Sequence, residues 1–115
     1  MFRHGVISYF GTCAVTGCVD LTLLIASHML PWKECNPIQA RDHYNGLLLS
    51  PNLDALFDKG LISFSDYGEI MMSPKLSPTD TKALAIDNAM KITKPLDPRH
   101  LVYLQHHRQN VFQAN

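Results

Sequence analysis

The chain of 115 residues is 46% hydrophobic and 17% charged, has a formal net charge of zero and contains three cysteines. These values suit one domain with a modest core and exclude a low-complexity chain, and the longest apolar run is far too short for a membrane span. The odd number of cysteines fits a reducing compartment better than a disulfide framework. Zero net charge also argues against a stand-alone protein that binds nucleic acid tightly, because that affinity comes mostly from lysine and arginine side chains that neutralise phosphates.

The first 50 residues predict one helix and two strands. Residues 2–10 form a mixed segment that predicts a short helix, and the stretch 11–20 is rich in turn residues. The apolar stretch 21–29 predicts a buried strand that ends before Pro31. The segment 30–44 has two prolines and no clean period, so we expect a long loop, and residues 46–50 (GLLLS) predict a second strand.

A helix is predicted over residues 51–59, since Ser50 suits the N-cap, Pro51 the first helical position and Gly60 the stop after the last turn. The two β-tolerant runs in residues 61–73 predict a hairpin that turns at 66–68. Helices are then expected over residues 78–91 and 98–112. The last has one broad face with Leu101, Leu104, Arg108, Val111 and Phe112. This order of elements indicates an α+β fold.

Asp54 and Asp58 stand four residues apart in the predicted helix 51–59, and therefore on the same side of it. Two carboxylates this close repel each other unless a cation lies between them, and Mg²⁺ and similar ions take such oxygen ligands. The alternative is a pair of exposed acids that the helix dipole favours near the N-terminal end.

Several segments resemble the HNH endonucleases, the ββα-metal nucleases, and most closely a restriction-type branch. The matching words are CAVTG (13–17), ASHMLPW (26–32), RDHYNGLLLSPNLDALFDKGLISF (41–64) and YLQHHRQNVF (103–112), and the pattern begins near residues 2–9. The resemblance implies one HNH nuclease domain over 1–115, with a ββα-metal core at about 13–65, an added β-hairpin and flanking helices. The C-terminal helical part would cover about 78–112.

The resemblance also implies roles for four residues. His28 takes the place of the general base, Asn45 that of the residue that orients it, and Asp54 and Asp58 those of the metal ligands. Carboxylates in place of imidazoles favour Mg²⁺ or Mn²⁺, with Zn²⁺ or Ni²⁺ as further options. Many relatives have an aspartate or histidine as a further ligand just before the base, whereas this chain has Ser27.

The expected activity is metal-dependent hydrolysis of DNA phosphodiester bonds, and the alternative is an inactive HNH-fold module that binds nucleic acid or protein. The resemblance and the basic charge of residues 91–115 make Arg41, His107 and Arg108 candidate DNA contacts. Alternatively, Arg41 pairs with Asp42 or Asp54. The alternative for His107 and Arg108 is that they lie on a solvated face of the predicted helix 98–112.

Two further expectations concern packing and cysteine chemistry. We expect Trp32 to pack in the core or the loop rather than to stack on bases. Cys13, Cys18 and Cys35 leave a structural zinc site open, although their spacing is looser than in a usual zinc knuckle.

The expected setting is cytoplasmic, with DNA as partner and no membrane. The cysteine count is odd and the N-terminus lacks an export signal. Because net charge is zero and the family pattern starts at residue 2, we also expect a homodimer or appended recognition domains.

Overall fold

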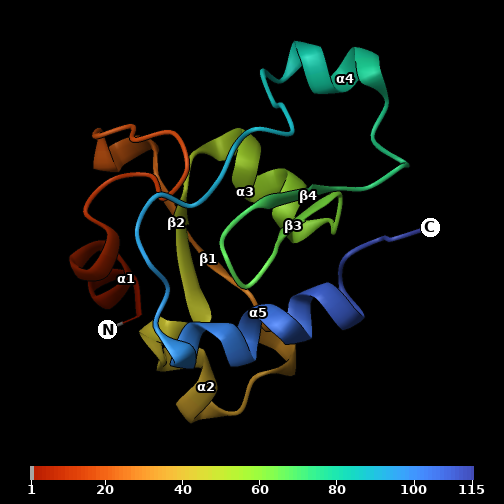
Figure 1. Cartoon of the computed structure of the whole chain (residues 1–115). Coiled ribbons are helices and arrows are strands. Elements are labelled where there is room, and N and C mark those ends of the chain that lie inside the picture. The colour runs from red at the N-terminus through yellow and green to blue at the C-terminus, as the bar shows by residue number, and fades with distance from the viewer. Residues whose placement is uncertain (1) are drawn as a thin grey trace.

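Two short antiparallel ribbons organise the computed structural model, which describes residues 2–115 (Figure 1). The helices are α1 (Phe2–Phe10), α2 (Pro37–Arg41), α3 (Pro51–Asp58), α4 (Pro78–Ala83) and α5 (Pro98–Asn110). Strands β1 (Ile25–His28) and β2 (Gly46–Leu49) form one ribbon, and β3 (Ile62–Phe64) and β4 (Ile70–Met72) form the other. Short 3-10 turns cover Leu21–Leu23, Trp32–Glu34 and His43–Asn45. The fold is α+β, and no helix in the described part of the chain is long and apolar enough to cross a bilayer.

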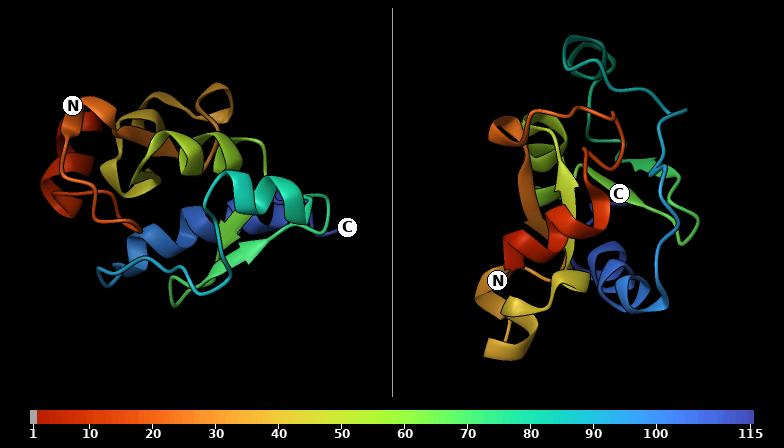
Figure 2. Two further views of the ribbon diagram at one scale, coloured as in Figure 1. Left: turned by 90° about the horizontal axis from the view of Figure 1, so that it is seen from above. Right: turned by 90° about the vertical axis from the view of Figure 1, so that its left-hand side faces the viewer.

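The β1–β2 ribbon lies between two helices, with α1 across one face and α3 against the other (Figure 2). The strands pair in a register that sets Ser27 opposite Leu47 and His28 opposite Gly46. Because successive side chains of a strand point to opposite faces, His28 turns toward α1 and Ser27 toward α3. The end of β1 therefore presents two neighbouring polar side chains to two different helices.

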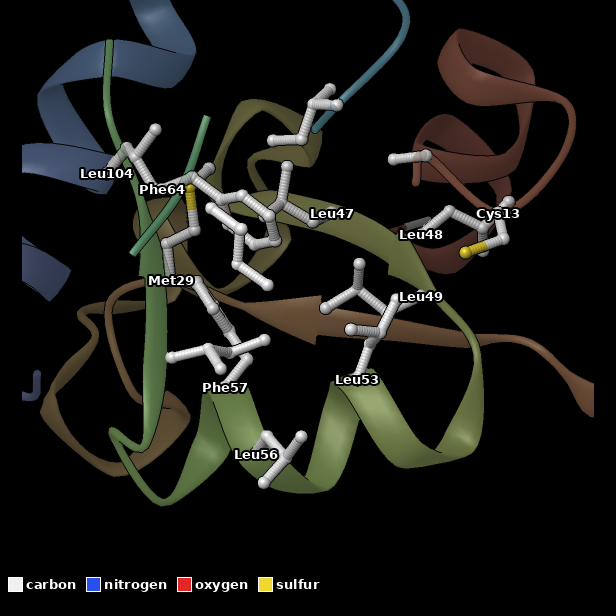
Figure 3. Packing of buried hydrophobic residues seen from close by; sticks show 14 of the residues in the cluster. Cys13, Met29, Leu47, Leu48, Leu49, Leu53, Leu56, Phe57, Phe64 and Leu104 are labelled. Atoms are coloured by element: carbon white, nitrogen blue, oxygen red, sulfur yellow. The ribbon is translucent and has the colours of Figure 1, made fainter. Parts of the chain in front are cut away.

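The core lies between α3, both ribbons and α5. Leu53 and Phe57 point from α3 toward the β1–β2 ribbon, as Figure 3 shows, and both are fully buried. Phe64 of β3 and Leu104 of α5 are also fully buried in this cluster. The apolar side of α3 is thus fixed by packing, and its polar edge, which carries Asp54 and Asp58, is left outside the core.

The structure confirms most of the predicted elements. These are the helices at 2–10 and near 51–59 and 98–112, the second strand and the hairpin. The strand predicted over 21–29 is too long, because the Asp20 side chain caps a 3-10 turn that occupies Leu21–Leu23. The segment 30–44 is not a plain loop, since Asn36 and Gln39 form a capping box that starts α2. Ser50 does stand at the N-cap of α3, but its side chain makes no capping hydrogen bond.

The helix predicted over 78–91 is wrong beyond Ala83. Ala85 adopts a positive φ of 57°, and the Ile86 amide donates back to the Thr81 carbonyl at 2.9 Å, which ends α4. The chain then runs beside the second ribbon, where the Ile70 amide donates to the Met90 carbonyl. Burial of apolar side chains and backbone pairing with the hairpin outweigh the helix propensity of this segment.

Candidate active site

A surface cleft of about 410 Å³ brings together residues from β1, the following loop and α3. We call it the His28 cleft, and its lining consists of Ala26, Ser27, His28, Pro31, Trp32, Lys33, Asp54, Phe57 and Asp58. Three of the four residues assigned to the site, His28, Asp54 and Asp58, therefore share one cleft although they come from separate elements. The fourth, Asn45, lies behind it.

The His28 ring is held on two sides. Its Nε2 lies 3.1 Å from the Ala40 carbonyl oxygen, and its face stacks on Phe2 at 3.8 Å between ring centroids. Gly46, opposite His28 in the ribbon, makes room for this stack, since a Cβ there would lie 2.7 Å from the Phe2 ring. Because a carbonyl only accepts hydrogen bonds, Nε2 of the neutral ring carries the proton. Nδ1 is then the nitrogen with a lone pair that can take a proton.

The two aspartates differ in their surroundings. Asp54 is half-buried and its Oδ1 accepts a hydrogen bond from the Ser27 hydroxyl, whereas Asp58, one turn later, is exposed. Ser27 therefore orients one carboxylate of the pair. Among residues 2–115 no three histidine, cysteine or acidic side chains gather in a cluster that could hold a metal ion.

The fit of a metal ion to this cleft thus depends on a carboxylate pair. Asp54 Oδ2 makes no hydrogen bond within residues 2–115, and neither carboxylate forms an ion pair there. Carboxylate oxygens are the donors that Mg²⁺ and Mn²⁺ prefer, and Mg²⁺ is commonly bound by one or two carboxylates with water and substrate phosphate completing the shell. The donor set fits a hard cation of this kind.

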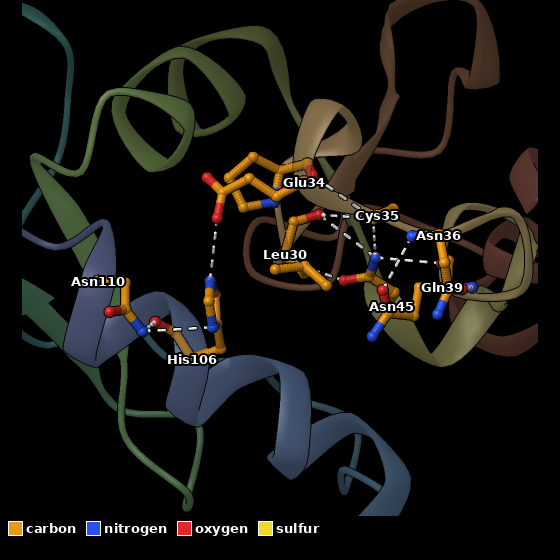
Figure 4. Close-up of polar contacts among 9 residues, drawn as sticks. Leu30, Glu34, Cys35, Asn36, Gln39, Asn45, His106 and Asn110 are labelled. Atoms are coloured by element: carbon orange, nitrogen blue, oxygen red, sulfur yellow. Dashed lines mark hydrogen bonds and ion pairs between the residues drawn. The ribbon is translucent and has the colours of Figure 1, made fainter.

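Asn45 is fully buried and braces the loop behind His28 (Figure 4). Its Oδ1 accepts from the Leu30 amide at 2.8 Å, and its Nδ2 lies 3.3 Å from both the Leu30 and the Gln39 carbonyl oxygens. Cys35 Sγ is a further partner of Nδ2 at 3.4 Å. Since Gln39 directly precedes Ala40, the amide of Asn45 holds the segment whose carbonyl accepts the hydrogen bond from His28.

His107 is withdrawn as a candidate DNA contact, because it is only 1% exposed. Its Nδ1 lies 2.8 Å from the Ser63 hydroxyl, and its Nε2 lies 2.8 Å from the Phe57 carbonyl oxygen. Burial lowers the pKa of His107 to about 4, so the ring is neutral at cellular pH. The side chain joins the end of α3 to β3 and α5, and its role is structural.

The two arginine candidates have different outcomes. The Arg108 guanidinium donates to the Phe64 carbonyl at 2.9 Å and pairs with Asp66 at 2.7 Å, so this side chain is held by the β3–β4 hairpin. Arg41 is exposed at the end of α2, and no ion pair joins it to Asp42 or Asp54 in the described chain. Arg41 therefore stays a candidate phosphate contact.

The cysteines do not come together as a zinc site within residues 2–115. Cys13 is buried, and its sulfur accepts a hydrogen bond from the Thr16 amide at 3.4 Å. Cys35 Sγ lies 3.4 Å from the carbonyl oxygens of Leu30 and Pro31, which adds to the Asn45 network.

Trp32 contradicts the expectation that it packs in the core or loop, because 70% of its surface is exposed. It stands at the rim of the His28 cleft beside Lys33. In the sequence, the feature that could have indicated a place near the site is that Trp32 follows His28 by only four residues.

The model of the family described as HNH endonuclease matches residues 13–65 of the chain. This range contains His28, Asn45, Asp54 and Asp58. A comparison with curated proteins finds no match.

Proposed function

We propose that the chain is a metal-dependent endonuclease that hydrolyses phosphodiester bonds of DNA, because the model of the HNH endonuclease family matches residues 13–65. The observation that carries this proposal is the convergence of His28, Asp54 and Asp58 on one cleft. A histidine with a free basic nitrogen in the same cleft as two carboxylates is a suitable set of groups for activating water next to a bound cation.

His28 is the proposed general base. Its Nε2 proton is directed at the Ala40 carbonyl, so Nδ1 is the atom that takes a proton from water. The resulting hydroxide attacks phosphorus, one P–O bond forms, and the bond to the leaving oxygen breaks. Phe2 and the Ala40 carbonyl keep the imidazole in one orientation while its protonation state changes.

Asp54 and Asp58 are the proposed metal ligands, with Asp54 oriented by Ser27. A bound Mg²⁺ or Mn²⁺ would neutralise charge on the phosphate and on the leaving oxygen. Lys33 lines the same cleft and adds a positive charge near the phosphate position. Asn45 acts as a positioning residue, since it braces the backbone on which His28 depends and does not line the cleft.

The second candidate function is an inactive HNH-fold module that binds nucleic acid or protein. It is favoured by Ser27, which takes the place where many relatives have a further metal ligand, and by a metal-binding side chain set that is only a pair. In this alternative, Asp54 and Asp58 would bind metal weakly and His28 would have no proton to accept.

Plasmid nicking distinguishes the two functions. We expect the wild-type chain to convert supercoiled DNA to the open circle with Mg²⁺ or Mn²⁺ and not with EDTA. His28→Ala should lower the rate by roughly 10²–10⁴-fold, the usual effect of losing a general base. His4→Ala, an exposed histidine outside the His28 cleft, is the matched control. Equal rates for the wild type and His28→Ala, with both variants folded, would refute the assignment of the base.

A further inference from the structure

Trp32 is the one tryptophan of the chain, and it is unusually exposed for its type. Its exposed fraction is 70%, although a tryptophan side chain contributes strongly to stability when it is buried. Tryptophan is enriched at binding interfaces, and this one lines a candidate active site. The question is which ligand covers it.

The position of Trp32 indicates the path of that ligand. Trp32 and Lys33 line the His28 cleft, and both also line a second hollow of about 360 Å³. We call this hollow the Cys35 groove, and its other lining residues are Cys35, Asn36, Pro37 and Ala40. Trp32 and Lys33 are thus the residues that the two hollows share. A polymer that occupies both hollows would pass these two side chains.

The loop that carries Trp32 is firmly held. The Glu34 amide donates to the Pro31 carbonyl at 2.8 Å and the Cys35 amide to the Trp32 carbonyl at 3.1 Å, and these bonds close the 3-10 turn Trp32–Glu34 that carries the indole. The Asn45 amide fixes both ends of the segment, at Leu30 and Gln39 (Figure 4).

A further contact ties this turn to the rest of the molecule. Glu34 Oε1 lies 3.8 Å from Nε2 of His106, so the turn also faces α5. A platform built in this way needs little ordering when a ligand binds, which favours affinity.

We propose that Trp32 is a stacking platform for a base of the DNA strand whose scissile phosphate lies in the His28 cleft, and that Lys33 contacts an adjacent phosphate. This inference rests on the proposed function for the position of the scissile phosphate. Nucleic acid is the occupant that fits both features, because proteins that bind strands without reading sequence combine aromatic platforms with cationic side chains.

Selectively excited tryptophan fluorescence tests the contact directly, because Trp32 is the source of all tryptophan emission. The measurement uses His28→Ala in Mg²⁺ with a 12-nucleotide single strand, so that cleavage does not interfere. We expect the oligonucleotide to quench the emission and to protect the indole from acrylamide. Unchanged emission and unchanged acrylamide access at saturating DNA would overturn the inference.

Affinity measurements with a labelled oligonucleotide supply the second readout. In the same background, Trp32→Ala should weaken binding by about 10- to 100-fold, the effect of losing one stacked base, and Trp32→Phe should retain most of the affinity. Tyr67→Ala is the matched control, since Tyr67 is 88% exposed but lines a different hollow at the β3–β4 turn. Equal affinities of the Trp32→Ala and Tyr67→Ala variants would contradict the proposal.

Salt dependence separates stacking from charge. Trp32→Ala should leave the slope of log K against log salt concentration unchanged, whereas Lys33→Ala should reduce it by about 1.

A blue shift of the emission with protein concentration in the absence of DNA would instead show that a second copy covers Trp32, and would overturn the proposal.

The outcomes also separate this inference from the proposed function. Stacking without any cleavage by the wild-type chain would refute the nuclease proposal and leave the binding site standing. Normal nicking by a Trp32→Ala variant with unchanged affinity would refute the stacking site and leave the nuclease proposal standing.

Discussion

Replacing Asn45 by alanine removes a buried amide that touches no part of the His28 cleft, and we expect it to lower both stability and activity. The Leu30 amide, which donates to Asn45 Oδ1 at 2.8 Å, would lose its partner in a place that water does not reach. An unsatisfied buried group costs about 1–3 kcal/mol, and loss of the two carbonyl contacts adds about 1 kcal/mol. The free energy of unfolding should fall by about 2–4 kcal/mol, which a domain with about 5–15 kcal/mol of stability survives.

The effect on activity follows from the Gln39 carbonyl, which Asn45 holds at 3.3 Å. Without this bond the neighbouring Ala40 carbonyl moves more freely, and the His28 ring loses its fixed orientation. Nicking should slow, while the affinity for Mn²⁺ should be unchanged, because Asp54 and Asp58 lie on α3 and their side chains make no contact with the Asn45 amide.

Urea unfolding, plasmid nicking and calorimetric titration of Mn²⁺ measure the three quantities on the same preparation. Asn88→Ala is the control, since Asn88 is exposed in the loop after α4 and its side chain makes no hydrogen bond in the described structure. A stability loss below about 0.5 kcal/mol with full activity would show that the network does not hold His28. A collapse of Mn²⁺ affinity would place Asn45 in the metal site and refute the reasoning.

Three further predictions use other parts of the molecule. Asp54→Asn should weaken Mn²⁺ binding more than Asp58→Asn in calorimetry, because Asp54 is the oriented carboxylate, and unchanged affinity in both variants would exclude the metal pair. Burial lowers the pKa of His100 and of His107 from 6.5 to about 4, so the unfolded chain binds protons first as the pH falls. Their contribution to stability is complete above about pH 6.5 and is lost toward pH 4. Each should account for up to about 2 kcal/mol between about pH 7 and pH 5 in urea unfolding, and His107→Gln should lose correspondingly less. Gly46→Ala should destabilise by about 1–3 kcal/mol and slow nicking, since its Cβ would meet α1 side chains at 2.5 and 2.7 Å; a stable, fully active variant would contradict this role of the glycine.

Much of the fold could be predicted from local sequence. The apolar spacing of Leu53, Leu56 and Phe57 and the Pro51 and Gly60 signals define α3 without reference to any other element. The β3–β4 hairpin and α5 carry similarly complete local patterns. The candidate site residues were also identified from the sequence, because the segments that resemble HNH endonucleases contain His28, Asn45, Asp54 and Asp58 in order.

The helix predicted over 78–91 shows where local reasoning ends. Its residues are good helix formers, yet the chain leaves the helix at Ala85 so that Ile86 and Ile92 can be buried and backbone groups can pair with β4. The free energy of those contacts depends on residues far along the chain, and propensity does not contain it.

Burial and exposure were decided by the tertiary structure alone. His107 has the residue type expected of a phosphate contact, but Ser63 and Phe57, 44 and 50 residues away in sequence, enclose it and satisfy both ring nitrogens. Trp32 has the residue type expected of a core, but within the described residues most of its surface stays exposed at the rim of the cleft. A side chain carries the same chemistry in both settings, and its role depends on which distant groups pack against it. Those partners are set only when β1 pairs with β2 and α3 and α5 close over the second ribbon.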